Sequence, residues 1–157
     1  MYRMRRWSAR HAAALHHLYD QVERGLAKIF PRLQQAGLPK TEKVILWVEK
    51  PLKQFLFDSQ SCGQCTLGST GMSCPMNCPK TLRNGPCGGV RPGGKCEVKP
   101  EMDCVWVVAW EGTRHLKPEQ RALHIVQPPL DARLKGRSAW LRAAAQRAMQ
   151  QKPGVQP

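Results

Sequence analysis

The segment "CPMNCPKTLRNGPCGG", residues 74–89, decides how the middle of this chain can fold. It holds three cysteines, and a proline directly follows two of them. Proline fixes φ and removes a backbone N–H, and adjacent glycines favour turns, so the segment predicts neither a helix nor a strand. We therefore expect a loop whose shape depends on what its cysteines bind.

Every cysteine of the chain lies between residues 62 and 104, a stretch that contains no histidine. The first two are separated by two residues, a spacing that lets both sulfurs reach one metal. We take the whole set as candidate metal ligands. The seven are Cys62, Cys65, Cys74, Cys78, Cys87, Cys96 and Cys104.

The expected cellular compartment favours metal binding by the cysteines over disulfide formation. The N-terminus is basic but lacks the apolar run of a secretory signal, and no apolar stretch is long enough to cross a bilayer. We expect a cytoplasmic protein without a membrane partner, in which thiols stay reduced. An odd number of clustered cysteines agrees with that expectation.

The spacing leaves the metal open. Zinc would take four thiolates and leave three unused, whereas the cysteine–proline steps are typical of iron–sulfur ligands. Seven thiols fit one cluster with spare thiols, or one cluster plus a three-thiol zinc site. We favour an iron–sulfur cluster of the [4Fe–4S] type, with zinc as the alternative or as a second metal.

The balance of charge favours acidic partners. Lysine and arginine number 25 against 11 aspartate and glutamate, which gives a formal net charge of +14. The positive charges are dispersed and form no run, so a nucleic-acid-binding zinc module is a remote alternative.

Helices are predicted on both sides of the cysteines. Apolar residues at three- and four-residue steps indicate a helix from a cap at Ser8, which Pro31 ends or kinks. A second helix should start after Thr41 and break at Pro51. A short helix after Pro118 and a last helix from a cap at Ser138 complete the prediction.

One strand is predicted where the cysteines end. The segment "CVWVVAW", residues 104–110, is rich in β-branched and aromatic residues and should form a buried strand. The predicted fold is thus small α+β: a metal-stabilised cysteine-rich loop module with short β elements, flanked by N-terminal and C-terminal helices. The expected segments are 1–57 (helical), 58–112 (cysteine-rich) and 113–157 (tail with a helix).

Catalytic patterns do not stand out. "GPCGG" lacks the strand and the helix that would flank a dinucleotide site. Glu49, Glu97 and Glu111 are interpreted as salt-bridged or solvated carboxylates. A self-contained enzyme is therefore the least favoured class, and no catalytic residue is assigned.

Residues 48–111 resemble a known family through the blocks "CPMNCPK", "RNGPCGG", "KCEV" and "CVWV". They are similar to the cysteine-rich domain at the C-terminus of some methylenetetrahydrofolate reductases. In acetogens and other bacteria this domain is a separate small subunit of the MetV type. The segment "PPLDARLKGRSAWL" also resembles that family.

The resemblance implies an accessory role in one-carbon metabolism. The flavin (FMN or FAD) and folate would bind to a partner, a (β/α)8-barrel methylenetetrahydrofolate reductase. This domain would carry metal on the seven cysteines and connect the barrel with an electron donor such as ferredoxin. The alternative is a zinc-stabilised docking subunit without a redox role.

Overall fold

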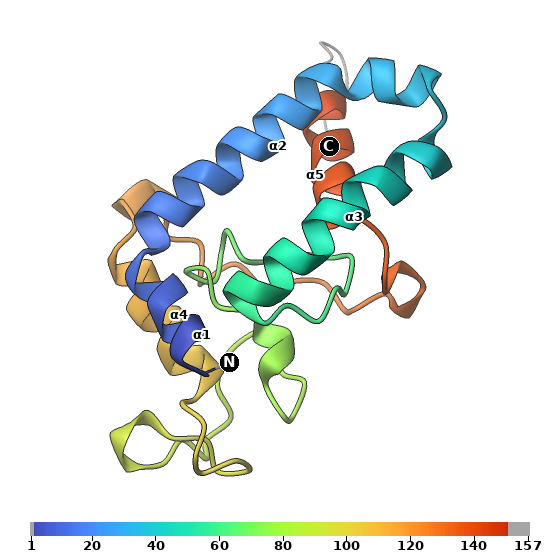
Figure 1. Cartoon of the computed structure of the whole chain (residues 1–157). Helices are drawn as coiled ribbons and strands as arrows, with labels where there is room; N and C mark the ends of the chain where they lie inside the picture. The colour runs from blue at the N-terminus through green and yellow to red at the C-terminus, as the bar shows by residue number, and fades with distance from the viewer. Residues whose placement is uncertain (1, 151–157) are drawn as a thin grey trace.

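The computed structural model describes residues 2–150. Its helices are α1 (Tyr2–Arg10), α2 (Ala12–Gln35), α3 (Leu38–Phe57), α4 (Val105–Arg114) and α5 (Ala139–Gln150). Four single 3₁₀ turns lie between them: η1 (Pro75–Asn77), η2 (Pro92–Gly94), η3 (Pro118–Gln120) and η4 (Ala132–Leu134). In Figure 1, α2 and α3 form an arm that extends away from α1, α4 and most of the loops.

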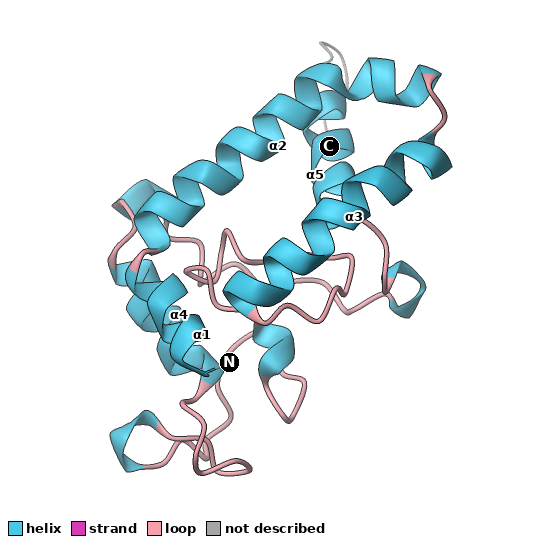
Figure 2. Cartoon of the chain, in the orientation of Figure 1, coloured by secondary structure: helices cyan, strands magenta, loops and turns pink. Residues whose placement is uncertain are grey.

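The predicted α+β class is wrong. Between residues 2 and 150 the chain contains no strand, and Figure 2 shows helix and loop only. Two isolated antiparallel bridges, Arg91 with Lys95 and Lys95 with Asp103, are the β pairing found in this range.

The segment expected to be a strand is helix α4. Its buried positions recur at the spacing of one helix face rather than on alternate residues. Burial of that face outweighs the β preference of its valines and tryptophans, because strand propensity mostly reflects packing. The buried residues are Val105, Trp106, Val108, Ala109, Gly112 and Thr113.

Close backbone packing holds α4 against the loop before it. A Cβ atom built on Gly112 would lie 2.1 Å from the carbonyl oxygen of Gly71. Gly71 itself has a φ of +55°, which L-residues with side chains adopt rarely. Both glycines are therefore required for this contact.

The N-terminal prediction is wrong about its start. The helix is divided at His11 into α1 and α2, and Ser8 lies inside α1 rather than capping a helix. The Ser8 hydroxyl is buried and donates a hydrogen bond to the carbonyl oxygen of Leu56, at 2.5 Å. Ser8 thus joins α1 to the end of α3.

Neither internal proline ends its helix. α2 continues past Pro31 to Gln35, and α3 starts at Leu38 and continues past Pro51 to Phe57. Both prolines are exposed, so water can hydrate the carbonyl group that each one deprives of a hydrogen bond. The predicted break at Pro51 is therefore wrong.

The C-terminal helix is confirmed. The Ser138 hydroxyl accepts a hydrogen bond from the backbone N–H of Leu141 at 3.1 Å, which is the predicted cap. α5 packs along α2, where Ala27, Phe30, Leu141 and Ala144 form a buried cluster. The short helix after Pro118 is also confirmed, as η3.

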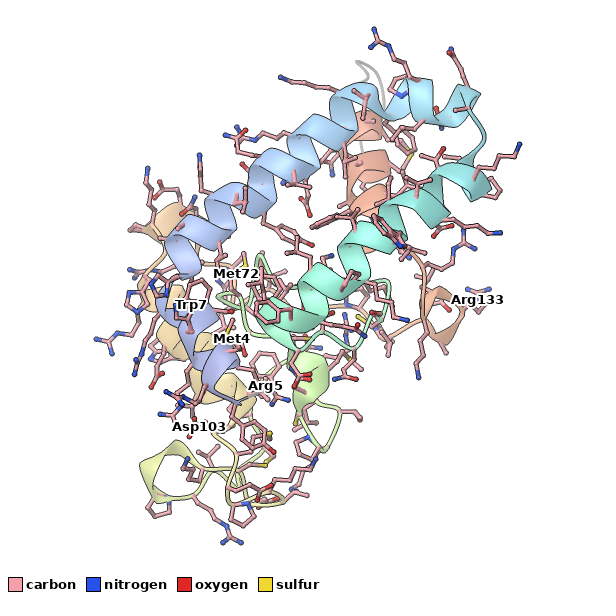
Figure 3. All side chains as sticks on the ribbon, in the orientation of Figure 1. Met4, Arg5, Trp7, Met72, Asp103 and Arg133 are labelled. Carbon is pink, nitrogen blue, oxygen red and sulfur yellow. The ribbon has the colours of Figure 1, made fainter. Side chains whose placement is uncertain are left out.

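Helix α1 attaches the loop module to the helices. Arg5 donates a hydrogen bond to Asp58 and Arg6 pairs with Asp103, so one turn of α1 contacts both ends of the cysteine-rich segment. Figure 3 shows the Arg5 side chain directed from α1 toward these loops. None of the helices in the described range has the length and apolar character needed to cross a membrane.

Candidate metal centre

The cysteines divide into two groups that line two different cavities. The four-thiol group lies between η1 and the start of α4. It comprises Cys78, Cys87, Cys96 and Cys104. The three-thiol group lies between the end of α3 and η1. It comprises Cys62, Cys65 and Cys74.

Short backbone links give the four-thiol group its shape. The N–H of Cys96 donates to the carbonyl oxygen of Met102 at 2.9 Å, and the N–H of Cys104 donates to that of Gly94 at 2.8 Å. These bonds hold two of the four cysteines side by side, and both are buried. The rest of the wall is mainly apolar and includes Val105.

Acidic and basic side chains lie at the edge of this cavity. Glu97 has an oxygen 3.9 Å from the Cys87 sulfur, and it forms an ion pair with Lys80. The expectation that Glu97 is salt-bridged is confirmed. A Cβ atom on Gly89 would meet the Glu97 carboxylate, so a larger residue there would require the Glu97 side chain to move.

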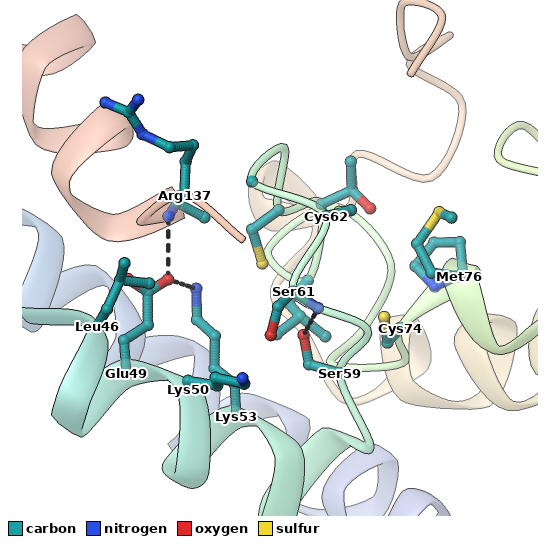
Figure 4. Close-up of a pocket in the computed structure, with 16 residues that line it drawn as sticks. Leu46, Glu49, Lys50, Lys53, Ser59, Ser61, Cys62, Cys74, Met76 and Arg137 are labelled. Carbon is teal, nitrogen blue, oxygen red and sulfur yellow. Dashed lines mark hydrogen bonds and ion pairs between the residues drawn. The ribbon is translucent and has the colours of Figure 1, made fainter. Parts of the chain in front are cut away.

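The three-thiol group lies beside helix α3. Figure 4 shows Cys62 and Cys74 on loop segments opposite Glu49 and Lys53 of that helix. Burial raises the pKa of the Cys74 thiol to about 11, and the neighbouring Cys65 and Cys62 add to the effect. Cys74 is therefore a neutral thiol at pH 7 unless a metal binds it.

A glycine brings the first cysteine pair close to the C-terminal tail. Gly63, between Cys62 and Cys65, has a φ of +74°. A Cβ atom there would lie 2.1 Å from the carbonyl oxygen of Leu134 in η4. The "CGQC" segment therefore fits only with glycine at its second position.

The sequence analysis missed a buried ion pair in this pocket. Lys53 donates to a Glu49 oxygen at 2.6 Å, and each residue is only 4% exposed. The Lys53 ammonium also lies about 5 Å from the ring centres of Tyr19 and Trp140. The four-residue spacing of Glu49 and Lys53 was the available signal.

Glu49 also binds the start of α5. Its carboxylate accepts hydrogen bonds from the Ser138 hydroxyl at 2.5 Å and from the N–H groups of Ala139 and Trp140 at 3.1 and 3.2 Å. A carboxylate at a helix N-terminus is stabilised by the unpaired N–H groups there. The expectation that Glu49 is salt-bridged is confirmed, and its role is structural. Glu111 is exposed, as expected of a solvated carboxylate.

Thiolates suit both candidate metals, but the sulfurs do not converge on one point. Within residues 2–150, no three cysteine, histidine or acidic side chains are gathered closely enough to hold a single metal ion. The ligands of a cluster each bind a different iron and stand farther apart than the ligands of one zinc. The grouping of four thiols around one cavity therefore matches a cluster in the number of ligands.

The small size of the four-thiol cavity argues against a cluster. The four-thiol cavity leaves a free volume of about 20 Å³, close to the space of one water molecule. A four-iron cluster would need the surrounding loops to move outward, whereas a zinc ion would need the thiols to move inward.

Comparison with protein families gives one match. The sequence profile described as methylene-tetrahydrofolate reductase C terminal matches residues 38–133. The chain belongs to this family. Comparison with curated proteins and with solved structures gave no match.

The family match includes the candidate metal centre. It begins at the first residue of α3 and ends within η4, so both thiol groups and α4 lie inside it. The resemblance seen in residues 48–111 is thereby confirmed as a relation to the methylenetetrahydrofolate reductase C-terminal domain. Helices α1, α2 and α5 lie outside the matched segment.

Proposed function

We propose that this chain is an accessory, non-catalytic subunit of a methylenetetrahydrofolate reductase, of the MetV type, and carries an iron–sulfur cluster. Its partner is a flavin-containing (β/α)8-barrel reductase that binds the folate. The grouping of four cysteines around one mainly apolar cavity carries this proposal. Family membership supports the association with the reductase.

Each part of the four-thiol group has a task in this proposal. Cys78, Cys87, Cys96 and Cys104 hold the cluster as thiolates, and the apolar wall limits access of water. A cluster bound there would take up and release single electrons, which the flavin needs in pairs for hydride transfer. The positive charge of the chain would attract an acidic donor protein such as a ferredoxin.

A zinc-stabilised docking subunit is the second candidate. The small free volume of the four-thiol cavity favours it, because one ion requires less space than a cluster. The three-thiol group could hold zinc in either case, with a fourth ligand from elsewhere.

Anaerobic purification with the reductase, followed by metal analysis and a visible spectrum before and after dithionite, tests the proposal. We expect about four irons per chain and absorption near about 400 nm that bleaches on reduction. One zinc per chain without iron would reject the electron-relay function and favour the docking subunit.

Two matched variants locate the metal. Cys87 and Cys62 are both half-buried, one in each group. Cys87→Ser should remove most of the iron, while Cys62→Ser should retain it, with circular dichroism as the check on folding. Equal iron loss in both variants would contradict the assignment of the cluster to the four-thiol group.

A further inference from the structure

Helix α3 exposes a broad apolar surface. Trp47 is 81% exposed, Val44 69% and Phe55 67%. Val48 and Leu52 are also exposed and lie between them on the helix, because the positions are three or four residues apart. We call these five residues the α3 face. A contiguous exposed apolar patch on a protein commonly marks a site of interaction with another molecule.

The opposite side of α3 is where the ion pair lies. Glu49 and Lys53 are buried there, while Trp47 and Phe55 are exposed, so part of the helix departs from the pattern of an ordinary surface helix. The hydrogen bonds of Glu49 to Ser138 and to the start of α5 prevent α3 from rotating about its own axis. The α3 face therefore cannot be buried by rotation within the chain.

The charges around the α3 face restrict its occupant. Lys40, Lys43 and Lys50 are exposed on α3. The two carboxylates of α3 are already engaged: Glu42 bonds to Arg137 and Ser138, and Glu49 is buried. A second copy would bring lysines against lysines, which is unfavourable. A surface with an apolar groove and carboxylates at its rim is complementary.

We propose that the α3 face is the docking surface for the reductase partner, which presents an apolar groove rimmed by carboxylates. This inference rests on the proposed function for the identity of the partner. The three-thiol pocket lies on the other side of α3, where Leu46, Glu49 and Lys53 line it (Figure 4). A partner seated on the α3 face would therefore be separated from the thiols of that pocket by the helix.

The affinity of purified chain for the purified reductase subunit, measured by calorimetry, tests this docking. Trp47→Ala with Phe55→Ala should weaken binding at least about thirtyfold, as loss of two aromatic anchors at an interface centre does. Trp110→Ala is the matched control, because Trp110 is 61% exposed but lies on α4. It should leave the affinity unchanged within about twofold.

Charge reversal gives a second test. Lys40→Glu with Lys43→Glu should weaken binding and reduce its dependence on salt, because attraction to the acidic rim is lost. Lys99→Glu, at an exposed lysine of the loop module, is the control and should have little effect.

The outcomes separate this inference from the proposed function. Binding that survives Trp47→Ala with Phe55→Ala would reject the α3 face while leaving the reductase as partner. No binding by the unaltered chain would reject the partner, and the docking with it. A dimer of the unaltered chain that these two substitutions dissociate would show a second copy as the occupant instead, and would overturn the proposal.

Discussion

Glu49 controls the position of two helices through one carboxylate. It lies on α3, is buried with Lys53, and accepts bonds from the first N–H groups of α5. A buried charge is costly when its partner is removed, because neither water nor another group replaces the lost interaction. Loss of the Glu49 carboxylate should therefore lower the free energy of unfolding.

Glu49→Gln should lower the free energy of unfolding by about 3–5 kcal/mol, because it leaves Lys53 charged, buried and unpaired. Urea unfolding of the purified chain measures the change. Glu111→Gln, at an exposed carboxylate, is the control and should change stability by no more than about 0.5 kcal/mol. Adding Lys53→Met to Glu49→Gln should restore part of the loss, and equal unfolding midpoints for Glu49→Gln and Glu111→Gln would contradict this account.

Glu42 gives a dependence on pH. Burial alone would raise its pKa, but the hydrogen bonds from Arg137 and from the N–H of Ser138, with the Arg137 charge, outweigh burial and lower the pKa. The unfolded chain then binds a proton more readily than the folded chain. The contribution of Glu42 to stability is complete above its unfolded pKa and is lost as the pH falls through the folded value.

Glu42→Gln should therefore be less stable than the unaltered chain at pH 7, by at most about 1 kcal/mol for a pair at the surface. The difference should shrink as the pH falls below about 5, because the unfolded chain takes up the proton first and the folded carboxylate, with its lowered pKa, takes it up later. Urea unfolding at a series of pH values measures it. A stability difference that is constant over this range would show that Glu42 acts by packing and not by charge.

At the scale of elements, α4 depends on its contact with the loop at Gly71. Gly112→Ala should destabilise the chain by more than about 1 kcal/mol, although alanine favours a helix, because the new methyl group would meet the Gly71 backbone. Gly25→Ala in α2 is the matched control: no atom lies near the added Cβ, so it should stabilise by about 0.5–1 kcal/mol. Thermal unfolding of both variants measures the pair, and stabilisation by Gly112→Ala would contradict the packing described here.

The elements also show what the sequence could predict. The α5 cap at Ser138 and the loop character of residues 58–104 follow from local chemistry, and both were predicted correctly. Helix α4 was predicted as a strand because a short apolar run fits both the two-residue period of a strand and the 3.6-residue period of a helix. Only the packing of the segment against Gly71 and the loops favours the helix. The continuation of α3 past Pro51 likewise depends on exposure, which the sequence does not contain.

The candidate site divides in the same way. The seven cysteines were predicted as metal ligands from their spacing and from the family resemblance, and that prediction is untested. Their division into groups of four and three depends on the path of the loops, which the sequence does not contain. Lys53 was missed because a lysine is rarely buried, and its place between Tyr19 and Trp140 requires residues far apart in the chain.

At the scale of the whole molecule, the loop module should depend on metal more than the helices do. Residues 58–104 have few regular hydrogen bonds, so a metal bound to their thiols would supply crosslinks that the fold does not. Removal of metal by a chelator should increase proteolysis within residues 78–104 at least about tenfold. Cleavage within α2 and α5 should change little, as mass spectrometry of the fragments would show. Equal acceleration in both regions would contradict a separate loop module.

The packing of α5 on α2 has a consequence for synthesis. Ribosomes release a protein from its N-terminus at about 5–20 residues per second. Helix α2 emerges early, but Ala27 and Phe30 are covered by Leu141 and Ala144 of α5, which emerges more than a hundred residues later. During synthesis the apolar side of α2 therefore stays exposed to water for several seconds before α5 can cover it. Chaperones that bind apolar segments can act on the nascent chain in this interval.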